Sequence, residues 1–154
     1  MPRRLLIVAN APSPNARTLA EAALAGARDE AVDGVEARWL EPLAAGPDDV
    51  LGADAILLGT TENFGALAGL VKDFLERIYE PCLERTAGLP WALWVRAGND
   101  GEGAVRSTAR IVAGLRWREA QPPLVLSGPW REDFPGRARE LGLTLAAGLE
   151  AGVL

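Results

Sequence analysis

Three short segments of this chain carry polar side chains and turn-forming residues in patterns that could bind a ligand. The first, residues 10–18, combines Ser13, Asn15 and Thr18 with the start of a helical pattern. Free backbone N–H groups at a helix N-terminus can hold a phosphate without a metal. Serine and asparagine are also preferred helix N-caps, so Ser13 or Asn15 could serve only that structural purpose. This segment alone favours neither interpretation.

The second segment, residues 59–65, offers hydroxyl, carboxylate and amide groups followed by Phe64. A planar ring could stack on that phenylalanine. Alternatively, Phe64 packs as an apolar staple and Thr61 caps the helix that follows, which is the commoner arrangement for a phenylalanine in this position.

The third segment, residues 96–103, contains three glycines in eight residues. Glycine lets the backbone approach a flat ligand closely and present N–H groups to it, although a tight turn explains the same composition. Glu62 and Asp100 could act as an acid/base pair, but solvated loop carboxylates are more common.

Composition excludes several kinds of chemistry. Histidine is absent, which removes Ser-His-Asp and Cys-His nucleophiles and every histidine metal site. Cys82 is the only cysteine, so we expect a spectator thiol, buried or half-buried, and no metal centre. With 16 Lys and Arg against 21 Asp and Glu, the formal charge is −5, which argues against nucleic acid as a partner.

Four apolar runs must position these segments. They are residues 5–9, 53–58, 91–95 and 124–126, and the first three lack polar alternation. Continuous apolar runs are typical of strands buried on both faces of a parallel sheet. Residues 35–39 alternate apolar with charged side chains, which predicts a half-exposed edge strand.

Helical spacing of apolar residues occupies the intervals between the runs. The clearest pattern consists of Leu67, Leu70, Val71, Phe74, Leu75 and Ile78. Further patterns begin at Leu19, Ala104 and Ala138, and the last continues to Leu149. Residues 47–51 predict a short helix that begins with a proline.

Regular alternation of strands and helices predicts an α/β fold with a parallel sheet and helices on both faces. We expect one domain over residues 1–154. In such sheets, ligands bind beyond the carboxyl ends of the strands, where the three polar segments fall.

The apolar run at residues 5–9 is shorter than the roughly 7–15 residues of a signal-peptide core, and no run approaches the roughly 18 residues of a membrane span. We therefore expect a cytoplasmic protein without a membrane partner. Trp39, Trp117 and Trp130 could form an interface between two copies of the chain or could cover helix ends.

The chain from Leu5 to about Gly148 resembles the flavodoxin-like family of FMN-binding proteins, specifically its short flavodoxin and NAD(P)H-dependent FMN reductase members. Residues 11–20 (APSPNARTLA) are similar to the phosphate loop S-P-S-G-N-T-R-x-L-A, and residues 47–56 (PDDVLGADAI) to P-E-D-L-L-E-A-D-A-I. Residues 60–65 (TTENFG) and 72–77 (KDFLER) resemble S-P-T-Y-F-G and K-A-F-L-D-R, the most specific part of the match.

The resemblance implies a three-layer α/β/α sandwich with a five-stranded parallel sheet in the order 2-1-3-4-5 and FMN at the first and third strands. By position, the phosphate would meet Ser13, Asn15, Ala16, Arg17 and Thr18. The flavin ring would lie between Thr60, Thr61, Glu62, Asn63, Phe64 and Gly65 on one side and Arg96, Ala97, Gly98, Asn99, Asp100 and Gly101 on the other. No side-chain acid or base is obligatory, because the flavin carries the redox chemistry.

Two departures concern the phosphate loop. Pro14 replaces the family's glycine and removes an N–H, and Ala16 replaces its threonine and removes a hydroxyl. Arg17 could offset this loss by pairing with the phosphate.

The leading hypothesis is an FMN-dependent oxidoreductase that takes hydride from NAD(P)H and passes it to a small acceptor such as a quinone. The absence of an aromatic residue in residues 96–103 favours it, because electron-carrier flavodoxins usually clamp the flavin between two aromatic residues. The alternatives are a flavodoxin-type electron carrier, and a domain that has lost FMN and acts by protein interaction.

Overall fold

A parallel sheet forms the centre of the molecule, as the apolar runs predict. The computed structural model describes all 154 residues. Its long strands are β1 (Arg3–Ala9), β2 (Val35–Leu40), β3 (Ala55–Asn63) and β5 (Pro90–Ala97). They lie in the order β2-β1-β3-β5, all parallel, which confirms the expected topology for this part of the sheet.

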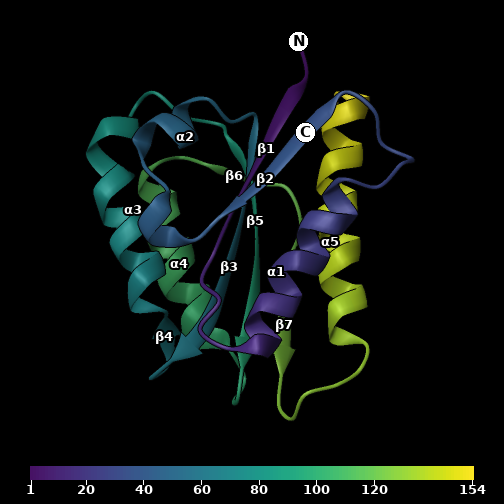
Figure 1. Cartoon of the computed structure of the whole chain (residues 1–154). Helices are drawn as coiled ribbons and strands as arrows, with labels where there is room; N and C mark the ends of the chain where they lie inside the picture. The colour runs from purple at the N-terminus through teal and green to yellow at the C-terminus, as the bar shows by residue number, and fades with distance from the viewer.

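Helices cover both faces of the sheet (Figure 1). One layer contains α1 (Pro14–Ala27) and α5 (Phe134–Ala151), and the other contains α2 (Pro47–Leu51), α3 (Gly69–Cys82) and α4 (Glu102–Gly114). Each layer has its own apolar core, of 22 buried residues beneath α2, α3 and α4 and of 19 beneath α1 and α5. Burial on this scale supplies most of the free energy of folding.

Close approaches in the core depend on glycines. A Cβ at Gly26 would lie 1.9 Å from the carbonyl oxygen of Arg139, and one at Gly142 would lie 2.0 Å from that of Ala23, so the backbones of α1 and α5 meet directly. In the sheet, a Cβ at Gly59 would lie 2.2 Å from the ring of Trp94. Larger side chains would force these elements apart.

The third strand is longer than the expected run at residues 53–58, and the segment that follows is not a loop. β3 begins at Ala55 and continues to Asn63, then turns back at once as β4 (Ala66–Leu67). Leu67, which the helical spacing assigns to the next helix, therefore lies in a strand. We call residues 60–67 the hairpin.

The fifth strand is broken. β6 (Arg118–Glu119) pairs with the start of β5 and β7 (Leu124–Ser127) with its end, both parallel. Residues 120–123, which include two prolines, separate the two pieces because proline lacks the N–H that a ladder needs. At the opposite border, β2 is half-exposed as its alternation predicts, and Arg28 donates from Nε and Nη2 to the carbonyl oxygen of Ala37, at 3.1 and 2.9 Å.

The helices form where the spacing predicts them. Two residues nevertheless differ from expectation, Leu70 in its burial and Trp117 in its availability for an interface. Leu70 is 47% exposed rather than buried, because it lies on the outer side of the first turn of α3, whereas Val71 next to it is fully buried. Trp117 is not available for an interface, since it is 7% exposed and its Nε1 donates to Thr86 Oγ1 at 2.9 Å.

Candidate functional site

The three polar segments meet at one border of the sheet, at the carboxyl ends of β1, β3 and β5, which is the lower end of the molecule in Figure 1. Because parallel strands all finish at the same border, segments far apart in the sequence are brought together there. We call this border the carboxyl edge. The amino end of the chain lies at the opposite end of the molecule (Figure 1).

The first segment ends in the cap of α1. Ser13 is the N-cap residue, and its Oγ accepts from the N–H of Ala16 at 3.2 Å, which confirms the capping interpretation. Pro14 occupies the first turn, and Thr18 Oγ1 donates to its carbonyl oxygen at 2.9 Å. The groups of this segment that are still free to meet an anion include the Ser13 hydroxyl proton, the backbone N–H groups of Ala11, Ser13 and Asn15, and the side-chain amide of Asn15.

Arg17 does not reach over the helix N-terminus. Its guanidinium carbon lies 5.4 Å from the ring centroid of Trp39, an arrangement typical of a cation–π contact. Trp39 is itself fixed, since its Nε1 donates to the carbonyl oxygen of Ala9 at 3.1 Å. Ala16 is buried at 5% exposure and directs no group outward.

Asn10 connects the first segment to the hairpin, although the residue patterns of the sequence did not single it out. Its Oδ1 accepts from the N–H of Thr61 at 3.3 Å, and its Nδ2 donates to Thr61 Oγ1 at 3.2 Å. Thr61 Oγ1 in turn donates to Asn63 Oδ1 at 3.0 Å. The available signal was position, because Asn10 directly follows a buried strand and is itself only 8% exposed.

The hairpin presents Phe64 to solvent. Phe64 is completely exposed and has φ +53°, and Gly65 has φ +75°. Left-handed backbone is unfavourable for a bulky residue and is frequent at functional sites. Phe64 is therefore not a staple, and Thr61 does not cap α3, whose N-cap is Ala68.

The position of the hairpin is fixed by its neighbours. Thr60 is buried, and its Oγ1 accepts from the N–H of Ala68 at 2.9 Å. The N–H of Leu67 donates to Ser107 Oγ of α4 at 3.0 Å. A Cβ at Gly103 would lie 1.8 Å from the carbonyl oxygen of Gly65, so the tip of the hairpin rests on the first turn of α4. Glu62 is half-exposed and pairs in register with Leu67.

The third segment offers backbone donors. The N–H groups of Gly98, Asn99 and Asp100 donate to no acceptor in the chain, and all three residues are exposed. A Cβ at Gly98 would meet no atom within 4 Å. Asp100 is engaged as a local cap, since its Oδ1 accepts from the N–H of Glu102 at 3.0 Å. Gly101 turns the chain into α4 with φ +72°.

Two residues assigned to this segment make contacts within the chain instead of presenting free groups to a ligand. Arg96 Nη1 donates to the carbonyl oxygens of Ala97 and Leu126 at 2.6 and 3.1 Å. Its guanidinium carbon lies 5.8 Å from the ring centroid of Trp130 and 5.3 Å from that of Phe134. Ala97 is buried at 1% exposure. These two residues stabilise the end of β5 and its contact with α5.

A cleft of about 260 Å³ adjoins the first segment. Its walls are residues 10–12, the short helix η1 (Pro42–Ala44) and Leu70. Leu43 and Leu70 are 69% and 47% exposed there. Apolar exposure is thus concentrated beside the polar loops, as in many ligand-binding sites.

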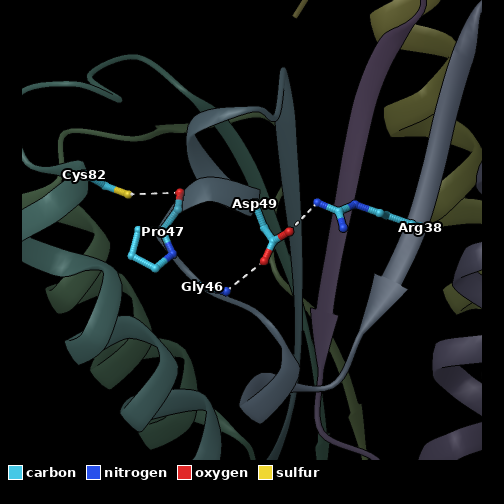
Figure 2. Close-up of polar contacts among 5 residues, drawn as sticks. All are labelled: Arg38, Gly46, Pro47, Asp49 and Cys82. Atoms are coloured by element: carbon cyan, nitrogen blue, oxygen red, sulfur yellow. Dashed lines mark hydrogen bonds and ion pairs between the residues drawn. The ribbon is translucent and has the colours of Figure 1, made fainter.

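A second polar cluster surrounds α2, near the amino ends of the strands (Figure 2). Asp49 accepts from the N–H of Gly46 at 2.9 Å and pairs with Arg38 Nη2 at 2.6 Å. Cys82 Sγ lies 4.0 Å from the carbonyl oxygen of Pro47, and burial raises the pKa of its thiol. The contacts in this cluster secure α2, and Cys82 is the buried thiol that was expected.

Neither a metal-binding cluster nor a membrane-spanning helix is present. No three His, Cys, Asp or Glu side chains are grouped so that they could hold an ion. The helices are too short or too polar to cross a bilayer.

The strand order and the loops at the carboxyl edge of the sheet define a doubly wound α/β protein. Comparison with solved structures identifies the fold more closely. No family model and no curated protein matches the sequence. A flavodoxin from the domain Archaea superposes with a TM-score of 0.79 at 18% identity, over 93% of this chain and 96% of that one. A mutant flavodoxin from Pseudomonas aeruginosa gives 0.77 at 21% identity, over 95% and 98%.

Rubredoxin oxygen:oxidoreductase from Desulfovibrio gigas also matches, with a TM-score of 0.78 at 15% identity. The match covers 96% of this chain but 36% of that larger protein. The three matches together show that the chain has a flavodoxin-like fold.

Proposed function

We propose that the chain is a flavoprotein that binds FMN at the carboxyl edge and transfers hydride from NAD(P)H to a quinone or a similar small acceptor. The observation that carries this proposal is the set of unpartnered N–H groups at Gly98, Asn99 and Asp100, beside a hairpin that holds Phe64 in solvent. Such groups suit a flat ring with polar edges. The flavodoxins named among the structural matches support the FMN-binding part of this proposal and are equally compatible with the electron-carrier alternative.

The residues present fit FMN better at its ring than at its phosphate. Phe64 supplies an apolar face, and Gly98 leaves open space in which a ring can approach the backbone. The phosphate would depend on Ser13 and Asn15, since Pro14 has no N–H and the Thr18 hydroxyl is already bonded. When bound, FMN supplies the capacity to accept and release hydride, and the protein supplies orientation and electrostatics.

Hydride transfer is favoured over single-electron carriage by the small number of aromatic residues. Phe64 is the only aromatic residue of the hairpin, and residues 96–103 contain none. The third segment therefore cannot cover a bound ring with a second aromatic side chain, which leaves room for a planar reactant.

Absorbance of the purified protein, before and after titration with FMN, tests the assignment. We expect saturable binding with quenched flavin fluorescence, followed by NADH or NADPH oxidation that depends on an added quinone. FMN binding with electron transfer only to a protein partner would favour the carrier alternative. No binding at high micromolar FMN would exclude both and leave the protein-interaction alternative.

Gly98→Val provides a sharper variant, because a Cβ at Gly98 would meet no atom within 4 Å and the larger side chain would occupy the open space proposed for the ring. We expect this variant to fold normally and to lose FMN affinity. Gly46→Val is the matched control, since a Cβ at Gly46 also meets no atom within 4 Å and α2, which Gly46 precedes, lies at the other end of the molecule from the carboxyl edge (Figure 1). Equal FMN affinity in both variants would remove the third segment from the site.

A further inference from the structure

The cleft beside the first segment gathers large apolar side chains that the fold leaves in solvent. The exposed large apolar residues of the whole chain are Met1, Leu43, Phe64, Leu70, Leu83 and Val153. Met1 and Val153 belong to the chain termini. Of the others, Leu43 and Leu70 line the cleft, and Phe64 lies at the same carboxyl edge. Such a concentration of exposed apolar surface marks a binding site.

The walls of the cleft are held in place by contacts with the rest of the fold. Arg77 of α3 donates to the carbonyl oxygens of Pro42 and Ala45, at 2.8 and 2.9 Å, which fixes η1 against α3. On the opposite wall, Asn10 is joined to Thr61 by two hydrogen bonds. The cleft is therefore preformed, as sites for small molecules usually are.

The cleft lies where the strand order reverses. Its walls come from the segment after β1, the segment after β2 and the start of α3, which follows β3 and the hairpin. In the sheet, β1 has β2 on one side and β3 on the other. At this crevice of doubly wound proteins, a dinucleotide crosses the carboxyl edge with its pyrophosphate at the N-terminus of the first helix. A carboxylate further along the βαβ unit accepts hydrogen bonds from the ribose of its adenosine.

Glu41 lies in a position to serve as that carboxylate. It directly follows β2, lines the cleft and is exposed. A hydrocarbon on this wall would remove water from the carboxylate without replacing its hydrogen bonds, whereas the 2′ and 3′ hydroxyls of a ribose are donors. A phosphate would be repelled, because both groups are negative. The cleft thus favours a neutral group with an apolar face and a hydroxyl edge, which describes a nucleoside.

The volume of the cleft suits one end of a larger ligand. At about 260 Å³ it is smaller than the roughly 300–1,000 Å³ of pockets that enclose a whole drug-sized molecule. It also adjoins the first segment, because residues 10–12 belong to both. A nucleoside in the cleft therefore has the free N–H groups of Ala11, Ser13 and Asn15 beside it, and these suit a phosphate.

We propose that the cleft binds the AMP half of an adenine dinucleotide. The adenine ring packs against Leu43 and Leu70, the ribose hydroxyls donate to Glu41, and the 5′-phosphate faces the first segment. FAD and NADH both carry this group, and NADPH is disfavoured because its 2′-phosphate would meet Glu41. Binding of AMP itself requires no flavin, whereas the use of the site for FAD or NADH rests on the proposed function.

Titration of the full chain, labelled with ¹⁵N and free of flavin, with AMP tests the site by NMR. We expect saturable shifts of the amide signals of Ala11, Leu43 and Leu70, with a Kd of about 1 mM or lower. Adenosine 2′,5′-diphosphate should bind at least tenfold more weakly than AMP. Glu41→Arg should reverse this preference, and Leu43→Asp should weaken AMP binding at least tenfold.

Glu80→Arg is the matched control, since it makes the same charge reversal at an exposed position near the far end of α3 from Leu70. Glu41 and Leu43 are exposed, so their substitutions leave the core intact, and thermal unfolding would verify this. The proposal is wrong if AMP gives no saturable shift at roughly 10 mM. It is equally wrong if Glu41→Arg and Leu43→Asp bind both nucleotides as the control does.

Titrations with whole cofactors distinguish the two sources of the AMP group. If the source is FAD, it should bind at least tenfold more tightly than FMN, and Leu43→Asp should abolish this difference. If the source is NADH, FAD and FMN should bind equally, Leu43→Asp should raise the KM for NADH more than it changes kcat, and Glu41→Arg should lower the KM for NADPH. AMP binding with neither pattern would refute the dinucleotide. AMP binding without flavin binding would refute the proposed function alone, and flavin binding without AMP binding would refute this inference alone.

Discussion

Replacing Pro14 with glycine should raise the affinity of the chain for FMN but not for riboflavin. Pro14 is in the first turn of α1. The backbone N–H groups of a first turn have no partner within the helix and point toward an anion bound at its N-terminus, but proline has no N–H. The cap leaves few such donors, because the N–H of Ala16 is bonded to Ser13 Oγ and that of Arg17 to the Ser13 carbonyl oxygen. One additional N–H would therefore increase appreciably the number of hydrogen-bond donors available to the phosphate.

The expected magnitude follows from the energy of a hydrogen bond to a charged group. Such a bond contributes about 1.5–3 kcal/mol, which corresponds to roughly 10- to 150-fold in the dissociation constant. The substitution also frees the unfolded backbone, which should lower the free energy of unfolding of the protein without ligand by about 1 kcal/mol. Affinity and stability thus change in opposite directions.

Fluorescence titration with each flavin measures the affinities, and urea unfolding measures the stability. Riboflavin serves as the internal control because it lacks the phosphate. Pro47→Gly is the matched variant, since Pro47 begins α2 in the same way at the other end of the molecule and should change only stability. If riboflavin affinity rises as much as FMN affinity, or neither changes, the phosphate does not lie at the N-terminus of α1.

Three further predictions concern the scaffold. Gly59→Ala should lower the free energy of unfolding by about 1–3 kcal/mol in urea titrations, because its Cβ would overlap the ring of Trp94; an unchanged midpoint would mean that the ring can move freely. Cys82 should resist thiol reagents at about pH 8 in the native state and react on unfolding, since burial raises the pKa of its thiol, and equal rates in both states would contradict this. The backbone N–H of Ala31, together with a neighbouring guanidinium, lowers the pKa of Asp29, so its ionised form adds stability above its unfolded pKa that is lost as the pH falls through the folded pKa. Asp29→Asn should therefore reduce the loss of stability below about pH 4 in acid titrations, whereas an unchanged acid profile would argue against this contribution.

The strands and helices could be predicted because local patterns determine them. The apolar runs around Ile7, Leu57 and Leu93 have no polar alternation, and such runs occur in strands covered on both faces. Likewise, the spacing of Phe74 and Ile78 requires one face of a helix to be buried.

The hairpin could not be predicted because its turn is unusual. Two-residue turns of this kind favour Asn-Gly or Asp-Gly, and here Phe64 occupies the first position with a left-handed backbone. Contacts with α4 hold it, through Gly103 and Ser107, and no local pattern reveals such distant partners. The resemblance to the flavodoxin-like family anticipated the fold but not this contact.

The orientation of charged side chains was also beyond sequence reasoning. Arg17 and Arg96 both lie in segments assigned to the ligand, yet each guanidinium lies over aromatic rings. Their partners, Trp39 and Trp130, come from other parts of the chain. Whether an arginine contacts a ligand or an aromatic ring therefore depends on the folded structure and not on the local sequence.

Neither border of the sheet presents a long uninterrupted row of free peptide groups, which bears on how the folded chain could aggregate. At one border, Arg28 donates hydrogen bonds to the carbonyl oxygen of Ala37 in β2. At the other border, Pro122 and Pro123 interrupt the outermost strand. A fibril grows when a chain adds its strand to a long row of free peptide groups, and neither border provides one. We therefore expect the native protein to resist the addition of strands that begins an amyloid fibril.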